Sequence, residues 1–344
     1  MTASTEQPLS TVPLMQLNAG FWSFKTFATA LELNLFTRLA GQRTVTLGEI
    51  AEELDIHERP ADMFLVACAS LGLLEKECDG YRNSALSEEF LVQGRPRYFG
   101  GFVRYCDQRE YSAWGHLIDA LRSNRPLTWS PGEQDSLFSA EDPVMTSLFW
   151  EAMHSMSCDT ARTLGEVYDF TRHRRLLDVG GGSGAYPIEL CSRYPGLKAT
   201  VFDLEHVCHI AERKVREAGL DLSVSMAVGD FQTDARLPGG HDVVLLSSIL
   251  HDWDEPTGRS LLRKCWEALE PGGVILISEL LLNADRDGPP EAALMGLNMI
   301  VETEGDKNYS GTEYRSWLLD AGFRQPCVVP FEAPGANGAV VALK

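Results

Sequence analysis

Residues 176–190, LLDVGGGSGAYPIEL, decide the fold of this 344-residue chain. The first four are typical of a short buried strand, and residues 186–194 have the character of a helix. The glycines between them form a turn, where side chains would hold a ligand away from the backbone and from the helix N-terminus. Strand, glycine turn and helix in this order open a doubly wound α/β fold of the nucleotide-binding kind.

The glycine turn favours a cationic ligand over a dinucleotide. Gly180, Gly182 and Gly184 occupy every second position, which is closer than the spacing of the dinucleotide fingerprint. Asp178 lies in the strand just before the turn, where its charge repels a pyrophosphate and attracts a cation. S-adenosylmethionine, whose sulfonium is positively charged, therefore suits this stretch better than NAD.

Further strands follow the glycine turn, mostly with helices between them. The pattern predicts strands at residues 176–179, 199–203, 223–227, 243–250, 274–281, 327–331 and 339–343. Residues 243–250 are largely apolar, as expected for a central strand that is buried on both faces. The C-terminal half is therefore predicted to be a Rossmann-like doubly wound sheet.

Polar and aromatic residues follow these strands at the sheet edge where open α/β folds bind ligands. Asp203 ends the second strand about twenty residues after the glycines, where an acid can hold a ribose diol. Asp230 and Phe231 supply an acid and a ring suited to the amino group and the face of adenine. With Asp178 and the glycine turn, they form the predicted cofactor site.

A histidine and a carboxylate end two strands that we expect to lie side by side. His251 follows the predicted central strand, and Glu279 lies near the end of the next one. A histidine oriented by a carboxylate is a general-base arrangement. Asp252 and Asp254 follow the histidine, but a second neutral ligand at metal-binding spacing is missing, so we predict no metal.

The N-terminal region is predicted to be a mostly helical, winged-helix domain. Residues 12–40 have apolar side chains at helical spacing, in a stripe wide enough either for an internal helix or for packing against a second subunit. Thr46 and Glu49 form the pattern of a capping box. A helix over residues 60–71 and a hairpin over residues 73–83 follow.

A winged helix often reads DNA, but this one lacks the side chains for that role. Arg59 is the only basic residue close to the would-be recognition helix. The whole chain has 49 acidic and 30 basic residues, a formal charge of −19. Since phosphate binding requires a basic surface, we predict no nucleic-acid partner and favour a dimerisation role.

Composition also bears on the compartment. The eight cysteines form no C-x-x-C pair, which favours free thiols in a reducing compartment. The N-terminal residues show no secretory signal, and no apolar run reaches the roughly 20 residues of a membrane span. We therefore expect a cytoplasmic protein without a membrane partner.

Six segments carry a family resemblance: DVGGGSG, FDLEHV, VGDF, ILHDWDE, LEPGGVILISE and YRSWLLDAGF. Together they resemble the caffeate- and hydroxyindole-type small-molecule O-methyltransferases, and the resemblance covers nearly the whole chain. It implies a methyltransferase that uses S-adenosylmethionine, forms a homodimer through its winged-helix domain and acts on a small phenolic aromatic. It also implies that His251 deprotonates the phenol and that Glu279 orients the histidine.

The resemblance implies further contacts. Trp253 falls beside the adenosine of the cofactor, and Ser157 falls near its methionine carboxylate. Met153 and Met299 fall where family members clamp a flat aromatic substrate, as polarizable side chains can. Residues 98–170 are rich in aromatic side chains and are predicted to form helices that cover the substrate, with Phe149 and Trp150 in the lining of the pocket. We accordingly divide the chain into a winged-helix dimerisation domain (residues 1–97), a helical connector (98–170) and a Rossmann-like methyltransferase domain (171–344).

Two residues depart from the family pattern. Ser247 stands four residues before the histidine, where the family usually has a basic residue near the cofactor. Asn308 stands where the family has a second glutamate beside the base. An amide can donate hydrogen bonds but cannot stabilise an imidazolium by charge, so we expect a weaker base with one acidic partner.

The predicted reaction is transfer of the sulfonium methyl group to a phenol oxygen, in secondary metabolism. The first alternative is methylation of a ring carbon of the same phenolic substrate, for example a hydroxylated aromatic amino acid. The alternative of another class is a cofactor-binding regulator built on the winged helix, which predicts specific DNA binding.

Overall fold

The computed structural model describes residues 9–41, 43–131, 143–305 and 307–344. They form two compact units, Met1–Asp107 and Gln108–Lys344. The first eight residues, on which the signal-peptide prediction depends, and part of the predicted connector lie outside the described ranges. Within those ranges, no helix is long and apolar enough to cross a membrane.

The first unit is a winged helix, as predicted. Its elements are α1 (Val12–Asn18), α2 (Gly20–Glu32), α3 (Leu35–Arg38), β1 (Val45–Thr46), α4 (Leu47–Glu53), α5 (Glu58–Ser70), β2 (Leu74–Glu77), β3 (Gly80–Asn83), α6 (Ala85–Phe90) and α7 (Gly100–Tyr105). The three strands pair antiparallel in the order β1-β3-β2. The Thr46–Glu49 capping box at the start of α4 is confirmed.

The apolar stretch over residues 12–40 forms three helices rather than one. α1 and α2 are separated by Ala19, and Asn34, in the left-handed conformation with φ of 55°, separates α2 from α3. Residues in α3 and the second half of α2 are buried in the core of this unit. The residues of α1 are instead exposed, together with Phe21 and Trp22 of α2.

The second unit contains the predicted doubly wound sheet. Its helices are α8 (Tyr111–Trp114), α9 (Leu117–Ser123), α10 (Pro143–Val167), α11 (Ala185–Arg193), α12 (Glu205–Glu217), α13 (Glu255–Ala268), α14 (Pro290–Glu302) and α15 (Gly311–Asp320). Its strands are β4 (Arg175–Val179), β5 (Lys198–Asp203), β6 (Val224–Val228), β7 (His241–Ser247), β8 (Leu269–Glu279), β9 (Arg324–Ala333) and β10 (Ala336–Leu343). They align in the order β6-β5-β4-β7-β8-β10-β9, in which β10 runs antiparallel to both of its neighbours, β8 and β9, and the other neighbouring pairs are parallel.

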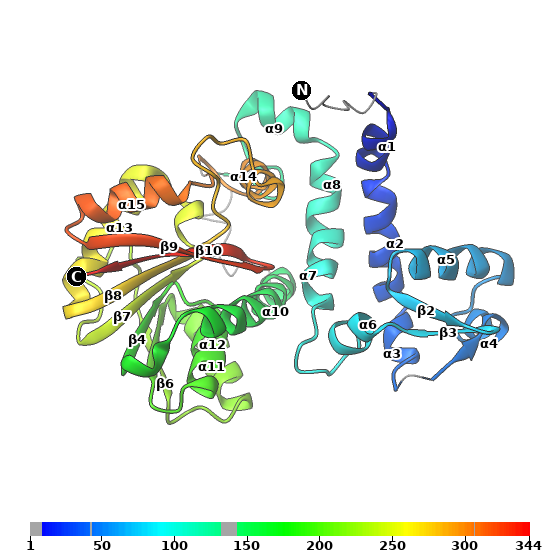
Figure 1. Cartoon of the computed structure of the whole chain (residues 1–344), viewed down its shortest axis with the longest axis horizontal. Helices are drawn as coiled ribbons and strands as arrows, with labels where there is room; N and C mark the ends of the chain where they lie inside the picture. The colour runs from blue at the N-terminus through cyan, green and yellow to red at the C-terminus, as the bar shows by residue number, and fades with distance from the viewer. Residues whose placement is uncertain (1–8, 42, 132–142, 306) are drawn as a thin grey trace, which may run out of the picture. The chain divides into compact units, whose positions relative to one another are not determined.

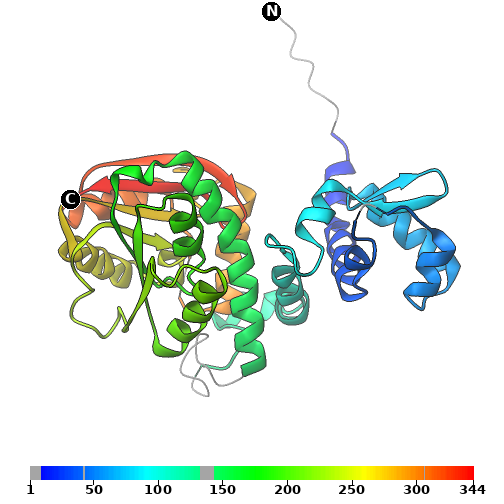
Figure 2. The same ribbon diagram turned by 90° about the horizontal axis from the view of Figure 1, so that it is seen from below.

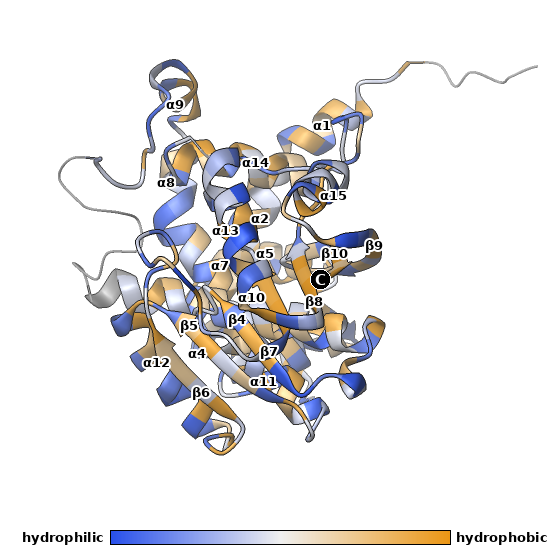
Figure 3. Ribbon diagram, turned by 90° about the vertical axis from the view of Figure 1, so that its left-hand side faces the viewer, coloured by the Kyte–Doolittle hydropathy of each residue, from blue (hydrophilic) through white to orange (hydrophobic). Residues whose placement is uncertain are grey.

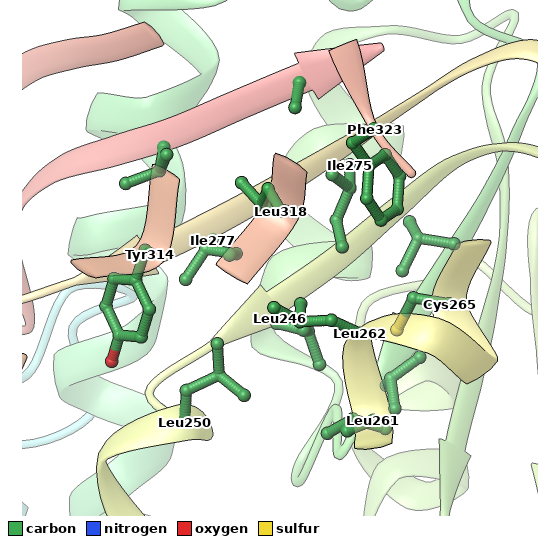
Figure 4. Close-up of a cluster of buried hydrophobic side chains, with 14 of the residues drawn as sticks. Leu246, Leu250, Leu261, Leu262, Cys265, Ile275, Ile277, Tyr314, Leu318 and Phe323 are labelled. Atoms are coloured by element: carbon green, nitrogen blue, oxygen red, sulfur yellow. The ribbon is translucent and has the colours of Figure 1, made fainter. Parts of the chain in front are cut away.

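Helices cover both faces of this sheet. α10, α11 and α12 lie on one face and α13 and α15 on the other (Figures 1 and 2). Each face of the sheet has its own hydrophobic core, and successive residues of β4 belong to different cores. Leu176 packs on the side of α10, α11 and α12, and Leu177 on the side of α13 and α15. Figure 3 shows that hydrophobic residues dominate the central strands, and Figure 4 shows the core beneath α13 and α15. The sheet is therefore buried on both faces, as its apolar strands predict.

One strand boundary differs from the prediction in a way that shapes the site. The strand predicted over residues 243–250 ends at Ser247, because Ser248 adopts a left-handed conformation with φ of 53°. The chain then turns into a 3-10 helix, η3 (Leu250–Asp252). Apolar spacing alone did not reveal this turn, since Ile249 and Leu250 continue the hydrophobic run.

Candidate active site

The glycine turn after β4 brings the backbone close to neighbouring side chains. Gly180 and Gly182 have φ of 67° and 56°, a region that side chains rarely adopt. A Cβ atom at Gly180 would lie 2.5 Å from the Ile249 side chain, and one at Gly182 would lie 2.7 Å from the Trp150 ring. The positive φ favours glycine at both positions, and a side chain there would also displace Ile249 or Trp150.

Asp178, at the start of this turn, has a buried carboxyl group with one oxygen that lacks a hydrogen-bond partner among the described residues. It is 1% exposed, and its Oδ2 atom has no hydrogen-bond partner within the described part of the chain. Burial, reinforced by the charge of Asp203, raises the pKa of Asp178 to about 8. A buried acid of this kind suits a cationic ligand, whose positive charge would pair with the ionised carboxylate.

The next two strand ends supply the residues predicted to hold adenosine. The Asp203 carboxylate accepts hydrogen bonds from the backbone N–H of Gly182 (2.8 Å) and of Leu204 (2.7 Å), which fixes it beside the glycine turn. Burial raises its pKa. The rings of Phe231 and Trp253 meet edge to face with centroids 5.6 Å apart.

Asp230 precedes Phe231 and holds its own loop. Its carboxylate accepts from the Gln232 N–H (2.8 Å) and the Thr233 hydroxyl (3.1 Å). The structure therefore places Asp203, Phe231 and Trp253 around the glycine turn, while the hydrogen bonds of Asp230 are directed to the turn that follows β6.

His251 and Glu279 meet as predicted. The strands β7 and β8 are parallel neighbours, paired through Ser247 and Ser278 at their ends. His251 Nδ1 lies 2.5 Å from Glu279 Oε2, and the two residues are 6% and 1% exposed. Glu279 therefore holds the His251 ring through Nδ1.

A second acid, Asp252, which the sequence suggests only as a metal ligand, lies beside the histidine. Asp252 Oδ1 is 3.4 Å from His251 Nε2. Burial is the main reason that the pKa of Asp252 is raised to about 6, although the histidine opposes the rise. The sequence pattern could have revealed this residue, because it directly follows the predicted base.

Asn308 does not take the place of the missing glutamate. It is 1% exposed, and its amide Nδ2 donates to the backbone oxygen of Leu280 (2.9 Å) rather than bonding to His251. Its Oδ1 is buried with no partner among the described residues. The prediction of a single acidic partner for His251 is nevertheless wrong, because Asp252 is a second acid beside the ring.

Ser247, the other departure, ends β7 with a buried hydroxyl. Near it the Tyr186 hydroxyl lies 3.3 Å from Ser278 Oγ, and the pKa of Tyr186 is raised by burial. Small hydroxyl groups and a tyrosine thus occupy the region where the family resemblance implies a basic side chain.

Two helices carry the residues predicted to contact substrate. Phe149, Trp150 and Met153 lie on α10, with Ser157 one turn further along, and Met299 is buried on α14. α14 packs against η3, which carries His251. The Trp150 ring also lies against Gly182 in the glycine turn, and its place in the substrate lining stays a prediction.

The residues present fit S-adenosylmethionine. The glycine turn offers backbone groups to a ligand, and the Asp178 carboxyl group offers an acid to a cation. The Phe231–Trp253 ring pair offers an apolar surface to an adenine. Over the described ranges, no group of three or more histidine, cysteine or acidic side chains is placed to hold a metal ion.

Comparison with known proteins identifies the family. The pattern of the O-methyltransferase domain matches residues 114–324, and that of the O-methyltransferase dimerisation domain matches residues 15–93. The chain is 44% identical over 331 residues to a 3-hydroxy-5-methyl-1-naphthoate 3-O-methyltransferase of Streptomyces sahachiroi, covering 96% of this chain and 94% of the relative. It is 33% identical to a tetracenomycin polyketide synthesis 8-O-methyl transferase of Streptomyces glaucescens, covering 90% of each chain.

A solved structure agrees with this assignment. Human N-acetylserotonin methyltransferase in complex with S-adenosylmethionine has a TM-score of 0.85, with 30% sequence identity and coverage of 99% of both chains. These matches favour an enzyme over the regulator alternative, and oxygen over carbon as the methyl acceptor. The chain belongs to the S-adenosylmethionine-dependent O-methyltransferase family and carries that family's dimerisation domain.

Proposed function

We propose that this enzyme methylates a phenolic hydroxyl on a fused-ring aromatic acid of secondary metabolism, with His251 as the general base. The observation that carries the proposal is the His251–Glu279 pair at the ends of β7 and β8, beside the glycine turn. The relative named as a naphthoate O-methyltransferase, identical at 44% of positions, supports a bicyclic hydroxy acid as the substrate class. The two methionines on α10 and α14 suit a flat ring system.

The histidine is prepared to accept a proton. Bound S-adenosylmethionine supplies an electrophilic methyl group. Glu279 accepts a hydrogen bond from Nδ1–H of His251, so the lone pair of the neutral ring lies on Nε2, the atom that would take the phenol proton. When Nε2 takes the phenol proton, the new imidazolium lies between two carboxylates, Glu279 and Asp252. Base catalysis of this kind contributes on the order of 10²–10⁴ in rate.

The exposed apolar residues of α1 and α2 support assembly into a homodimer. They are Val12, Leu14, Met15, Leu17, Phe21 and Trp22, each more than half exposed. Within one chain they form an apolar surface that a second copy could cover. We propose that the dimerisation domain pairs through them, and that the protein works in the cytoplasm, where its eight cysteines remain the free thiols of this structure.

Product analysis tests the proposal. The enzyme is incubated with methyl-labelled S-adenosylmethionine and a panel of hydroxynaphthoates, catechols and hydroxylated aromatic amino acids, and NMR locates the label. We expect label on a phenol oxygen of a hydroxynaphthoate, and a loss of about 10²–10⁴ in kcat for His251→Gln. Label on a ring carbon would show that the acceptor is wrong, and wild-type turnover by His251→Gln would remove the histidine from the mechanism.

A further inference from the structure

His154 is a partly buried titratable residue that the methyl-transfer mechanism does not use. It lies on α10, and its Nδ1 is 2.8 Å from the hydroxyl of Ser183 in the glycine turn. Its Nε2 is 3.5 Å from the Cys158 thiol, one turn further along the same helix. The short Nδ1 bond to Ser183 sets the orientation of the imidazole, and the thiol is a weaker partner of Nε2.

The same face of α10 makes a second contact with the glycine turn. Trp150, Met153, His154 and Ser157 are spaced as i, i+3, i+4 and i+7, and so lie on one side of the helix. Trp150 packs against Gly182, the residue before Ser183. Two side chains from one helix face thus hold two consecutive residues of the turn.

The contact is between uncharged groups at neutral pH. Burial, with a smaller effect of Lys214, lowers the pKa of His154 to about 4, although the Glu151 charge opposes this. Burial also raises the pKa of Cys158 to about 12. The imidazole and the thiol are therefore both neutral under working conditions, and the hydrogen bond to Ser183 persists across the physiological range.

We propose that His154 is a positioning residue for the cofactor, holding Ser183 so that the glycine turn keeps its binding shape before the ligand arrives. The inference rests on the proposed function, since it concerns the same cofactor site. Three glycines of the turn, at positions 180, 182 and 184, have positive φ and few conformational restraints of their own. A turn that is ordered in advance binds more tightly, because less conformational entropy is lost on binding.

Two substitutions separate the hydrogen bond to Ser183 from the rest of the side chain. In His154→Asn the amide group reaches the position of Nδ1, so it can still bond to Ser183. In His154→Gln the amide reaches the position of Nε2, near Cys158. We expect calorimetric titration to show S-adenosylmethionine bound about five- to tenfold more weakly by His154→Gln, with the affinity largely retained in His154→Asn.

Kinetics provide a readout that a merely structural role would not give. The KM for S-adenosylmethionine should rise in His154→Gln, whereas kcat and the KM for the aromatic substrate stay within about twofold of wild type. Cys158→Ala is the matched control: it removes the Nε2 contact, keeps the Ser183 bond, and should bind the cofactor like wild type. Equal affinity in wild type, His154→Asn and His154→Gln would overturn the proposal.

Ser183→Ala tests the same bond from the other side, should His154→Gln fail to fold by circular dichroism. It should show the same five- to tenfold loss, and wild-type affinity would contradict the proposal. The titration requires no turnover, so a selective loss in His154→Gln supports the positioning role even if no phenol in the panel is methylated. Conversely, O-methylation by a His154→Gln enzyme of unchanged affinity overturns the positioning role and leaves the proposed function standing.

Discussion

Both oxygens of the Glu279 carboxylate are hydrogen-bonded, one to the His251 ring and the other to the backbone just before His251. Its Oε1 accepts the backbone N–H groups of Ile249 and Leu250 at 3.0 Å each, and its Oε2 faces His251 Nδ1 at 2.5 Å. One buried side chain therefore fixes both the turn after β7 and the ring orientation of the histidine. The left-handed Ser248 makes this possible, because it points the next two N–H groups toward β8.

Glu279→Gln should lower kcat by about 10²–10⁴ while the Kd for S-adenosylmethionine changes less than about twofold. The glutamine can still accept the two backbone N–H groups through its oxygen. Its NH₂ group then faces Nδ1, which favours the tautomer that carries the proton on Nε2 and so cannot act as a base. Rapid-quench kinetics with labelled cofactor and calorimetric titration measure the two quantities. Unchanged kcat would show that Glu279 serves only to hold the turn.

Asp252→Asn should change the acid side of the pH profile. Because the pKa of Asp252 is raised to about 6, wild type loses this negative charge as pH falls through 6, and the imidazolium formed during catalysis loses one stabilising partner. We expect kcat/KM of the variant to be lower at pH 7–8 and less steep between pH 5 and 7. Profiles of identical slope would show that the Asp252 charge has no part in the reaction.

The same substitution should stabilise the fold. A carboxyl whose pKa is higher in the folded chain favours folding when protonated, and this contribution is lost as pH rises through about 6. Keeping Asp252 ionised at pH 7 therefore costs about 3 kcal/mol. The Tm of Asp252→Asn should exceed that of wild type at pH 7 and approach it near pH 4. A constant difference across this range would contradict the assignment.

Asn308→Glu, which restores the residue that the family resemblance implies, should not improve catalysis. A glutamate cannot donate to the Leu280 carbonyl, and it adds a charge at a position that is 1% exposed. We expect a loss of about 1–3 kcal/mol in stability and no rise in kcat. Asn308→Asp separates charge from length, and should destabilise in the same direction. A rise in kcat with unchanged Tm would show that a glutamate at this position still serves the base.

Much of the fold was predictable because its signals are local or periodic. The strand before Gly180, the capping box at Thr46 and the apolar strands of the sheet each depend on neighbouring residues or simple spacing. The meeting of His251 and Glu279 also followed, since the ends of parallel strands share one edge of the sheet.

The remaining features depend on tertiary contacts that spacing does not encode. The sequence does not show that the Trp150 ring lies against Gly182 in the glycine turn. Asn308 occupies the position of a catalytic glutamate, yet its amide bonds to Leu280. Ser248 interrupts an apolar run with a conformation that serine rarely adopts. In each case the rotamer or backbone angle is set by packing rather than by local sequence.

Binding of S-adenosylmethionine should release a proton from Asp178. In the chain without ligand the pKa of this carboxyl is about 8, so the group is mostly protonated at pH 7. A cationic ligand beside it favours the ionised form and lowers that pKa. We expect release of close to one proton per cofactor at pH 7 and almost none at pH 9, where the carboxyl is already ionised. Titration calorimetry in phosphate and Tris buffers, which differ in ionisation enthalpy, measures this number. Asp178→Asn should abolish the buffer dependence and weaken binding, whereas a release that persists in this variant would assign the proton to another group.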